Sequence, residues 1–258
     1  TADTTSYILD QTAPTISFSS VDISADTGTS AADFNTKTAA QTLTGTLSAA
    51  MASDDILKVS VDAGSSWDDV TSDVTGTPDT ALSTAITLSG TSAIHLQITD
   101  DAGNAGTADT TSYTLDTAAP TLTITIASNN ANTAQAKSGD VVTLTLEPSE
   151  TLQGNPACTI DGEAGTASAS GDNHLCALTL SGDETAGNLA FSVTGGGTFA
   201  DVAGNNGATD TSANSGSVNV DFTAPTVTIS GIGISADTGT ASDDFETATA
   251  AQTLTATL

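Results

Sequence analysis

The sequence predicts an all-β protein made of tandem β-sandwich domains. Composition is the first observation behind this prediction, because Thr is abundant while Glu, Lys and Gln are scarce, Arg is absent and aromatic residues make up only 3% of the 258 residues. Thr and Val favour strands, whereas Glu, Lys, Gln and Arg are the better helix formers. The other two observations are a long-period internal repeat and short segments of alternating hydrophobicity.

The repeat has the length of a whole domain. The segment TADTTSYILDQTAPT at Thr1–Thr15 returns as TADTTSYTLDTAAPT at Thr107–Thr121, and a looser copy, VDFTAPT, lies at Val220–Thr226. Each copy places an Asp four residues before a Pro. The prolines recur after 106 and then 105 residues: Pro14, Pro120 and Pro225. This period is too long for a solenoid unit and suits a small domain.

These boundaries divide the chain into four expected parts. Residues 1–10 are expected to be the last strand of a preceding repeat, 11–116 a first domain, 117–221 a second domain and 222–258 the truncated start of a third. The third domain is expected to be of the first domain's type. Residues 21–47 return at 232–258 with 19 of 27 positions identical, including the phrase ISADTGT.

Within the domains, alternation of apolar and polar residues predicts the strands. The first domain gives segments 15–21, 41–47, 56–62, 81–88, 93–99 and 110–116, with a hairpin from AGSS into WDDV. The second gives 121–127, 140–146, 157–161, 174–180, 189–194 and 217–221. About seven short antiparallel strands in about 100 residues, with turn residues between them, predict an immunoglobulin-like sandwich for each domain.

The two cysteines, Cys158 and Cys176, are both expected to point into the core of the second domain. Cys158 shares a strand face with Ile160, and Cys176 shares one with Leu178 and Leu180. A disulfide closing this loop would contribute about 3 kcal/mol and would suit an exported protein. Two buried free thiols are the alternative.

The net charge of −28, with only three Lys to set against 31 acidic residues, limits the partners of this chain. No basic patch can form, so binding to nucleic acid or to an anionic membrane surface is not expected. No stretch approaches 18 apolar residues, so no membrane insertion is expected. The acidic surface has two open interpretations, namely adaptation to salt and a set of calcium sites.

Topology favours calcium sites where domains meet. In such a sandwich the loop after the first strand faces the next domain, and the loop between the last two strands faces the previous one. Calcium takes six to eight oxygen ligands, which carboxylates, amide oxygens and main-chain carbonyls supply. The predicted ligands are Asp26, Asp33, Asp116, Asp201 and Asn205 at the first–second junction, Asp10, Asp100, Asp101 and Asn104 upstream, and Asp221, Asp237 and Asp244 downstream.

Plain turn formation competes with calcium binding as the role of these acidic loops. The DDAGN and DVAGN segments are good hairpin loops, because Gly supplies a positive φ and Asp or Asn forms side-chain turns. The loop after the first strand of the second domain, ASNNANTAQAKSGD, has lost the acidic phrase, so weaker binding is expected there.

Catalysis is not expected from this sequence. His95 and His174 have no nucleophile in a suitable pattern, and no phosphate loop, HExxH or GxSxG motif occurs. Trp67 is interpreted as a packing residue.

The segments TLDTAAPT, ISADTGTSAADF, QTLTGTLSAA, LKVSVDAGSSWDDVT and IHLQITDDAGNAG together resemble the bacterial immunoglobulin-like (BIg) tandem repeats of large type I-secreted surface adhesins. The resemblance covers nearly all of the chain. It implies secretion, many tandem copies and Ca²⁺ at the junctions, with Asp10, Asp116 and Asp221 as linker acids and Asp100 and Asp201 as loop acids. The two cysteines depart from the pattern of such repeats.

The resemblance implies an extracellular extender region at the bacterial cell surface, which holds a terminal ligand-binding domain away from the cell. Its partners would be neighbouring repeats, with a host-surface or biofilm ligand bound through other regions of the protein. Two alternatives stay open. One is a carbohydrate- or protein-binding module, which would need an exposed aromatic cluster or a deep groove, and the other is the spacer region of a secreted hydrolase.

Overall fold

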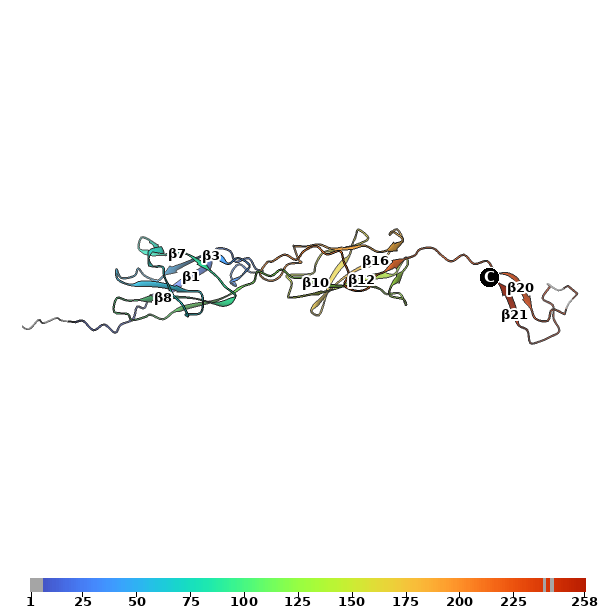
Figure 1. Cartoon of the computed structure of the whole chain (residues 1–258), viewed down its shortest axis with the longest axis horizontal. Coiled ribbons are helices and arrows are strands. Elements are labelled where there is room, and N and C mark those ends of the chain that lie inside the picture. Colours follow the sequence, from blue (N-terminus) through green and yellow to red (C-terminus); the bar gives the residue numbers. More distant parts are fainter. Residues whose placement is uncertain (1–6, 239, 242–243) are drawn as a thin grey trace, which may run out of the picture. The chain divides into compact units, whose positions relative to one another are not determined.

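The computed structural model describes residues 7–238, 240–241 and 244–258, and its chain divides into two compact units, Thr1–Val220 and Asp221–Leu258. The prediction of an all-β fold is confirmed, because the described elements are β-strands apart from one short 3₁₀ turn, η1 (Thr71–Asp73) (Figure 1). The strand expected at 1–10 lies mostly outside the described residues, and 7–10 form no strand. Each unit is described separately below.

The first half of unit 1 is a two-sheet sandwich. One sheet has the order β1 (Phe18–Ile23), β3 (Ala40–Leu47), β7 (Asp79–Thr87), β6 (Val74–Gly76). The other has the order β2 (Asn35–Thr36), β9 (Asp109–Leu115), β8 (Thr91–Thr99), β4 (Ile56–Ser60), β5 (Asp68–Asp69). The pairs are antiparallel except β2 with β9, which is parallel. This arrangement is that of an immunoglobulin-like sandwich.

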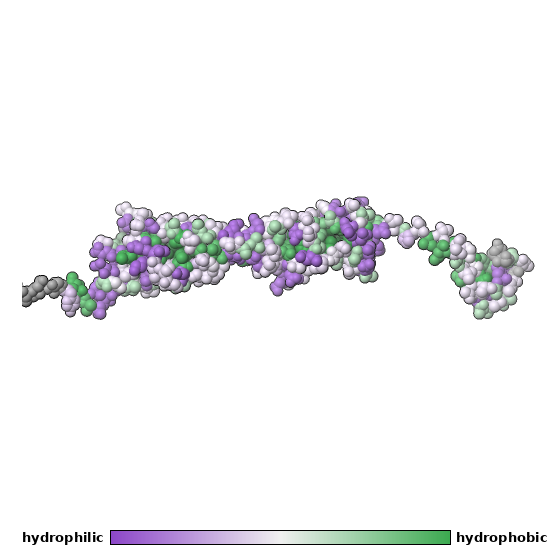
Figure 2. Space-filling view, viewed as in Figure 1, coloured by the Kyte–Doolittle hydropathy of each residue, from purple (hydrophilic) through white to green (hydrophobic). Residues whose placement is uncertain are grey.

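Strict alternation of side chains builds the core of this sandwich. Along β3 every second residue is buried, so Leu43 and Leu47 face inward while the threonines between them face solvent. Across the core, the inner face of β8 contributes Ile94, Leu96 and Ile98, each at most 2% exposed. Burying a Leu or Ile side chain contributes about 1.5–3 kcal/mol, so these two strands alone account for much of the driving force. Hydrophilic and near-neutral residues cover much of the face in view, with hydrophobic residues visible between them (Figure 2).

The second half of unit 1 repeats the plan with shorter strands. One sheet has the order β10 (Leu122–Ser128), β12 (Val141–Pro148), β16 (Asn173–Thr179), β15 (Thr166–Ser170). The facing strands form two three-stranded sheets, β11 (Gln135–Ala136), β19 (Asn219–Val220), β17 (Gly187–Asn188) and β14 (Glu163–Ala164), β13 (Cys158–Ile160), β18 (Phe191–Val193). As in the first half, the short parallel pair joins an early strand, β11, to the last one, β19.

A disulfide between Cys158 and Cys176 joins β13 of one sheet to β16 of the other, with a Cα–Cα distance of 6.4 Å. Both cysteines are buried. Gly165 packs directly against the bridge, since a Cβ at this position would lie only 2.3 Å from the Cys176 sulfur. The bridge therefore links the two layers at a point where no side chain would fit.

The structure differs from the predicted strands in several places. The first strand was expected at 15–21 but runs from Phe18 to Ile23, and it contains a positive φ of 50° at Ser20 and an irregular pairing with β3 between Ser19 and Asp22. β15 was not predicted. Its sequence, TASAS, contains no large apolar residue, and pairing with β16 rather than hydrophobicity defines it.

The described residues of unit 2 form one antiparallel pair, β20 (Ser230–Ile234) and β21 (Leu254–Thr257). Its loop reproduces the loop after β1. The side-chain oxygen of Gln252 accepts the Ala236 N–H at 2.8 Å, as that of Gln41 accepts the Ala25 N–H at 2.8 Å. The internal sequence repeat is thus also a repeat of local hydrogen bonding.

The disulfide predicts a measurable loss of stability. Replacing Cys158 and Cys176 by Ala together is expected to lower the free energy of unfolding of the β10–β19 sandwich by about 3 kcal/mol, because the bridge restricts the unfolded chain. Denaturant unfolding in the presence and absence of a reducing agent measures this. The reducing agent should destabilise the natural chain and leave the double variant unchanged. Equal stability of the natural chain and the double variant in the absence of reducing agent would contradict the prediction.

Candidate metal centre at Asp116

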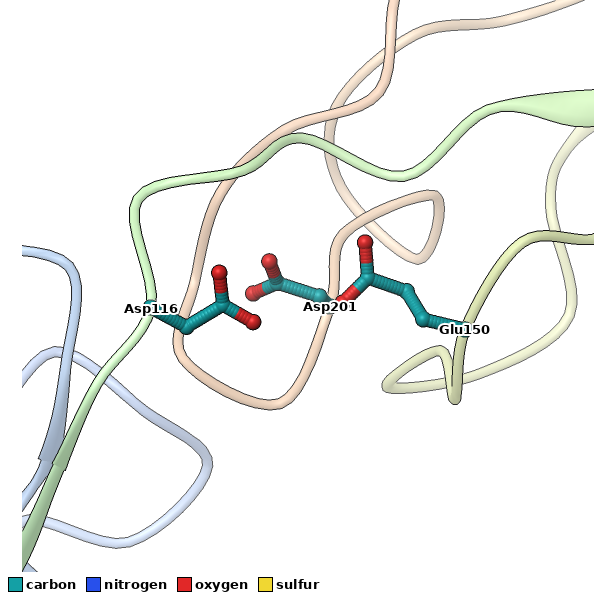
Figure 3. A group of neighbouring side chains, drawn as sticks. All are labelled: Asp116, Glu150 and Asp201. Atoms are coloured by element: carbon teal, nitrogen blue, oxygen red, sulfur yellow. The ribbon is translucent and has the colours of Figure 1, made fainter. Parts of the chain in front are cut away.

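Asp116 directly follows β9 and is held by main-chain bonds on both sides. Its N–H donates to the Thr36 carbonyl at 2.9 Å, in the first sandwich, and its own carbonyl accepts the Asn205 side-chain amide at 2.8 Å, in the second. One carboxylate oxygen, Oδ1, accepts the Ala118 N–H at 2.9 Å. These bonds orient the side chain toward the loop that contains Asp201 (Figure 3).

Asp201 opens the DVAGN loop and is fully buried, with 0% of its surface exposed. Its Oδ1 accepts the N–H groups of Ala203 and Asn205, each at 2.9 Å, and its Oδ2 accepts the Asn205 side-chain amide at 2.7 Å. Gly204 closes the turn at φ 93°, a conformation that favours glycine. These hydrogen bonds offset part of the cost of burying the carboxylate, and they fix its position.

Glu150 brings the third carboxylate. It follows β12, and the pairing of β12 with β10 continues to Ser149, whose N–H donates to the Thr121 carbonyl at 2.9 Å. This register places Glu150 beside the start of the second sandwich. Carboxylate oxygens of Asp116, Glu150 and Asp201 all lie within 4.8 Å of one another (Figure 3).

The electrostatics of this group favour a positive charge among its members. Burial raises the pKa of Glu150, and the negative charges of Asp116 and Asp201 and a hydrogen bond with Asp116 raise it further. Every one of these influences disfavours the ionised form. All the donors are oxygens, which is the ligand set of a hard cation such as Ca²⁺ and not of zinc or copper. The residues present therefore fit calcium.

The corresponding place at the start of the first sandwich has only two of these acids. The Asn104 side-chain amide donates to the Asp10 carbonyl at 3.2 Å and to Asp100 Oδ2 at 2.8 Å, and this side-chain bond lowers the pKa of Asp100. Ser48 pairs with Ser17 as Ser149 pairs with Thr121. The residue after Ser48 is Ala49, so the position of Glu150 has no acid there.

The sequence predicted Asp26 and Asp33 as partners of Asp116 and Asp201. In the structure, the carboxylate that joins Asp116 and Asp201 is that of Glu150. Asp26 Oδ2 accepts the Phe34 N–H at 2.9 Å, and exposed Asp33 caps the Asn35 N–H at 3.0 Å. Asp26 Oδ1 and Asn35 Oδ1 are buried and accept no hydrogen bond from the described residues. This loop therefore contains two oxygens available to a cation or a water molecule.

The remaining predicted ligands are not members of the group of three. Asp101 is exposed at the tip of the DDAGN loop. In unit 2, Asp221 Oδ1 accepts the Thr223 N–H at 2.8 Å and Asp244 Oδ1 accepts the Glu246 N–H at 3.0 Å. Asp237 repeats the role of Asp26, since its Oδ2 accepts the Phe245 N–H at 3.2 Å and its Oδ1 is buried without a partner among the described residues.

Aromatic and histidine side chains serve local structure. The Trp67 ring packs against the His95 ring, with centroids 6.1 Å apart, and its N–H donates to the Gly64 carbonyl at 3.1 Å. His174 lies 2.7 Å from the Asn155 side-chain oxygen, and burial lowers its pKa. Cys176, two residues away, is in the disulfide and is therefore not a free nucleophile.

Comparisons with known proteins give distant likenesses only. No family model matches the chain, and no curated protein matches it. A structure from a 1.5-MDa bacterial ice-binding adhesin, studied for its retention at the host cell surface, has 18% identity, covers 84% of this chain and 69% of its own, and has a TM-score of 0.44. The fibronectin(III)-like modules of Clostridium thermocellum CbhA have 12% identity, cover 80% of this chain and 93% of their own, and have a TM-score of 0.30.

A third structure, SGBP-B of the Bacteroides ovatus mixed-linkage glucan utilization locus, was solved with a mixed-linkage heptasaccharide. It has 15% identity, covers 81% of this chain and 48% of its own, and has a TM-score of 0.25. At such low identities and TM-scores, nothing about the function of this chain follows from the three structures.

The raised pKa of Glu150 predicts a pH effect on the metal-free protein. Below the ordinary carboxyl pKa, protonated Glu150 stabilises the fold, and this contribution is lost as pH rises through the raised pKa. Glu150→Gln keeps a neutral side chain at every pH. In chelator it is therefore expected to raise Tm at pH 7 and to leave Tm near pH 4 almost unchanged, as measured by thermal unfolding.

The matched control is Glu147→Gln, which neutralises an exposed acid on β12, the strand that Glu150 follows. It is expected to shift Tm at pH 7 by less than Glu150→Gln does. A Glu150→Gln protein that is less stable than the natural chain at pH 7 in chelator would contradict the prediction.

Proposed function

We propose that this chain is an extracellular spacer region of a bacterial surface adhesin, in which bound calcium stiffens the boundary between successive sandwiches. The observation that supports this best is the group of three carboxylates within 4.8 Å at Asp116, Glu150 and Asp201. Asp116 belongs to the segment between the two sandwiches, and the other two belong to the second sandwich. A cation bound by all three would therefore fasten the connecting segment to the sandwich that follows it.

Calcium would be held by the carboxylates of Asp116, Glu150 and Asp201, with water or main-chain oxygens completing its ligands. When bound, it supplies the positive charge that offsets the repulsion of the three acids. The chain's own hydrogen bonds orient the ligands: Asn205 holds Asp116 through its carbonyl and Asp201 through its carboxylate. Ionised Glu150 is the form that binds, so its raised pKa makes protons compete with calcium as pH falls.

The surface chemistry suits a spacer outside the cell. A disulfide such as Cys158–Cys176 persists in oxidising surroundings. The net charge of −28 favours solubility and repels nucleic acid and anionic membranes. No helix in the described part of the chain has the length and apolarity of a membrane span. The adhesin-like sequence motifs point the same way, and adhesion to a host surface or within a biofilm would use regions beyond these repeats.

A gain of calcium binding would test the assignment of ligands. Ala49→Glu adds a carboxylate at the position in the first sandwich that corresponds to Glu150, beside Asp10 and Asp100. The variant is expected to bind one more calcium ion per chain than the natural protein, whereas Glu150→Gln is expected to bind one fewer. Isothermal titration calorimetry at pH 7 measures both. Ala50→Glu, one residue further along, is the matched control and should leave the stoichiometry unchanged.

Stiffening is tested by small-angle scattering of the full chain with calcium and with chelator. Calcium is expected to reduce flexibility and to narrow the distribution of maximum dimension, and Asp116→Ala is expected to abolish the difference. Identical scattering curves in calcium and in chelator would contradict the proposed function, even if calcium were bound.

A further inference from the structure

The DVAGN loop of the second sandwich is seated in the first sandwich by contacts that involve no carboxylate. Its three consecutive carbonyls, those of Val202, Ala203 and Gly204, each accept a hydrogen bond. The donors are the Thr29 N–H at 3.3 Å, the Thr27 hydroxyl at 2.7 Å and the Lys37 ammonium at 2.6 Å, in that order. Residues 25–37, which follow β1, therefore form a binding site for this turn, and we call them the receptor loop.

The fit between the two loops leaves no space for a further carbon atom. A Cβ on Gly204 would lie 2.4 Å from the Thr27 carbonyl oxygen, and a Cβ on Gly28 would lie 2.6 Å from the Val202 carbonyl oxygen. Ala203, at the tip, is 0% exposed. Backbone approaches backbone here, so glycine is required for contact as well as for the turn.

The DDAGN loop of the first sandwich has the same internal structure. Asp100 N–H donates to the Asn104 carbonyl at 3.1 Å, as Asp201 N–H donates to that of Asn205 at 3.0 Å. Gly103 has φ 89° and Gly204 has φ 93°. The side-chain amide at the fifth position donates to the first aspartate in both loops, at 2.8 Å and 2.7 Å.

The surroundings of the two loops differ completely. Asp101, Ala102 and Gly103 are exposed, and their carbonyls accept no hydrogen bond from the described residues. A Cβ added to Gly103 would meet nothing within 4 Å. The DDAGN loop thus has the internal structure of the seated turn, while its tip is left exposed by the described residues.

We propose that the DDAGN loop is a docking surface whose partner is a receptor loop of the Ala25–Lys37 type on another copy of this repeat. Asp101 replaces Val202, but the seated turn uses the carbonyl at this position, which every residue has. The contact is made by N–H, hydroxyl and ammonium donors, so it does not require calcium. This inference goes beyond the proposed function, because it gives the repeats a metal-independent means of recognising one another.

The two copies of the receptor loop differ at the position of Lys37. In the second copy of the phrase, in unit 2, Ala248 stands where Lys37 stands in the first. The main-chain hydrogen bond at this position is kept, since the Ala248 N–H donates to the Thr238 hydroxyl at 2.9 Å as the Lys37 N–H donates to that of Thr27. A receptor loop with Lys is therefore expected to hold a DxAGN turn more tightly than one with Ala.

The test uses the full chain and an extended chain in which a second copy of residues 11–116 directly precedes Gln11. This junction keeps the four-residue spacing from Asp to Pro. Gly103→Asn is introduced in the copy that follows the added one, because Asn tolerates a positive φ but brings a Cβ. All measurements are made in chelator, so that failure of the calcium proposal does not affect the result.

Gly103→Asn is expected to lower Tm of the extended chain by about 2–4 °C more than it lowers Tm of the original chain, because only the extended chain seats this turn. Gly204→Asn in the original chain is the reference and is expected to show a similar loss. Lys37→Ala in the added copy should reproduce part of the shift. Equal effects of Gly103→Asn in the two chains would overturn the proposal, as would a Gly204→Asn effect no larger than that of Gly103→Asn in the original chain.

Discussion

Mutual repulsion of three carboxylates is the constraint on which the boundary between the two sandwiches depends. Asp116, Glu150 and Asp201 approach within 4.8 Å in a chain with a net charge of −28. At about 4 Å, like charges near a protein surface cost about 4 kcal/mol per pair at an effective dielectric constant of 20. A proton or a cation would offset this repulsion, and the raised pKa of Glu150 favours the protonated form of that carboxyl.

The scaffold holds these acids together in spite of that repulsion. The end of β9 positions Asp116, the register of β10 with β12 positions Glu150, and the closed DVAGN turn positions Asp201. Beside them, Thr27, Thr29 and Lys37 seat the same turn through its carbonyls. The boundary thus combines an electrostatic contact that needs a counter-charge with a main-chain contact that does not. Calcium would then act on a boundary that is already partly ordered.

Sequence patterns predicted the fold well because alternation and burial coincide here. The Leu43 and Leu47 face of β3 and the inward cysteines follow directly from period-two patterning. Asp116 and Asp201 were predictable because repeated motifs mark them and sandwich topology brings their loops together. Glu150 was missed, since only the pairing of Ser149 with Thr121 shows that the end of β12 lies beside the linker. That pairing depends on strand register, which composition and motif repeats do not specify.

Lys37 was missed for a related reason. As one of three lysines its charge was noted, but nothing in the sequence shows that its ammonium reaches the Gly204 carbonyl, 167 residues away. Asp26 and Asp33 carried the more conspicuous acidic signal, yet they bind the main chain of their own loop. In both cases the contact is set by how two loops meet, which is a property of tertiary structure.

The most direct measurement is a crystal structure of the chain grown in calcium, with anomalous diffraction used to locate the ion. Calcium-mediated stiffening of the boundary predicts an anomalous peak between Asp116, Glu150 and Asp201, about 2.3–2.6 Å from an oxygen of each. A structure with no peak there, and with the three carboxylates turned away from one another into solvent, would contradict it.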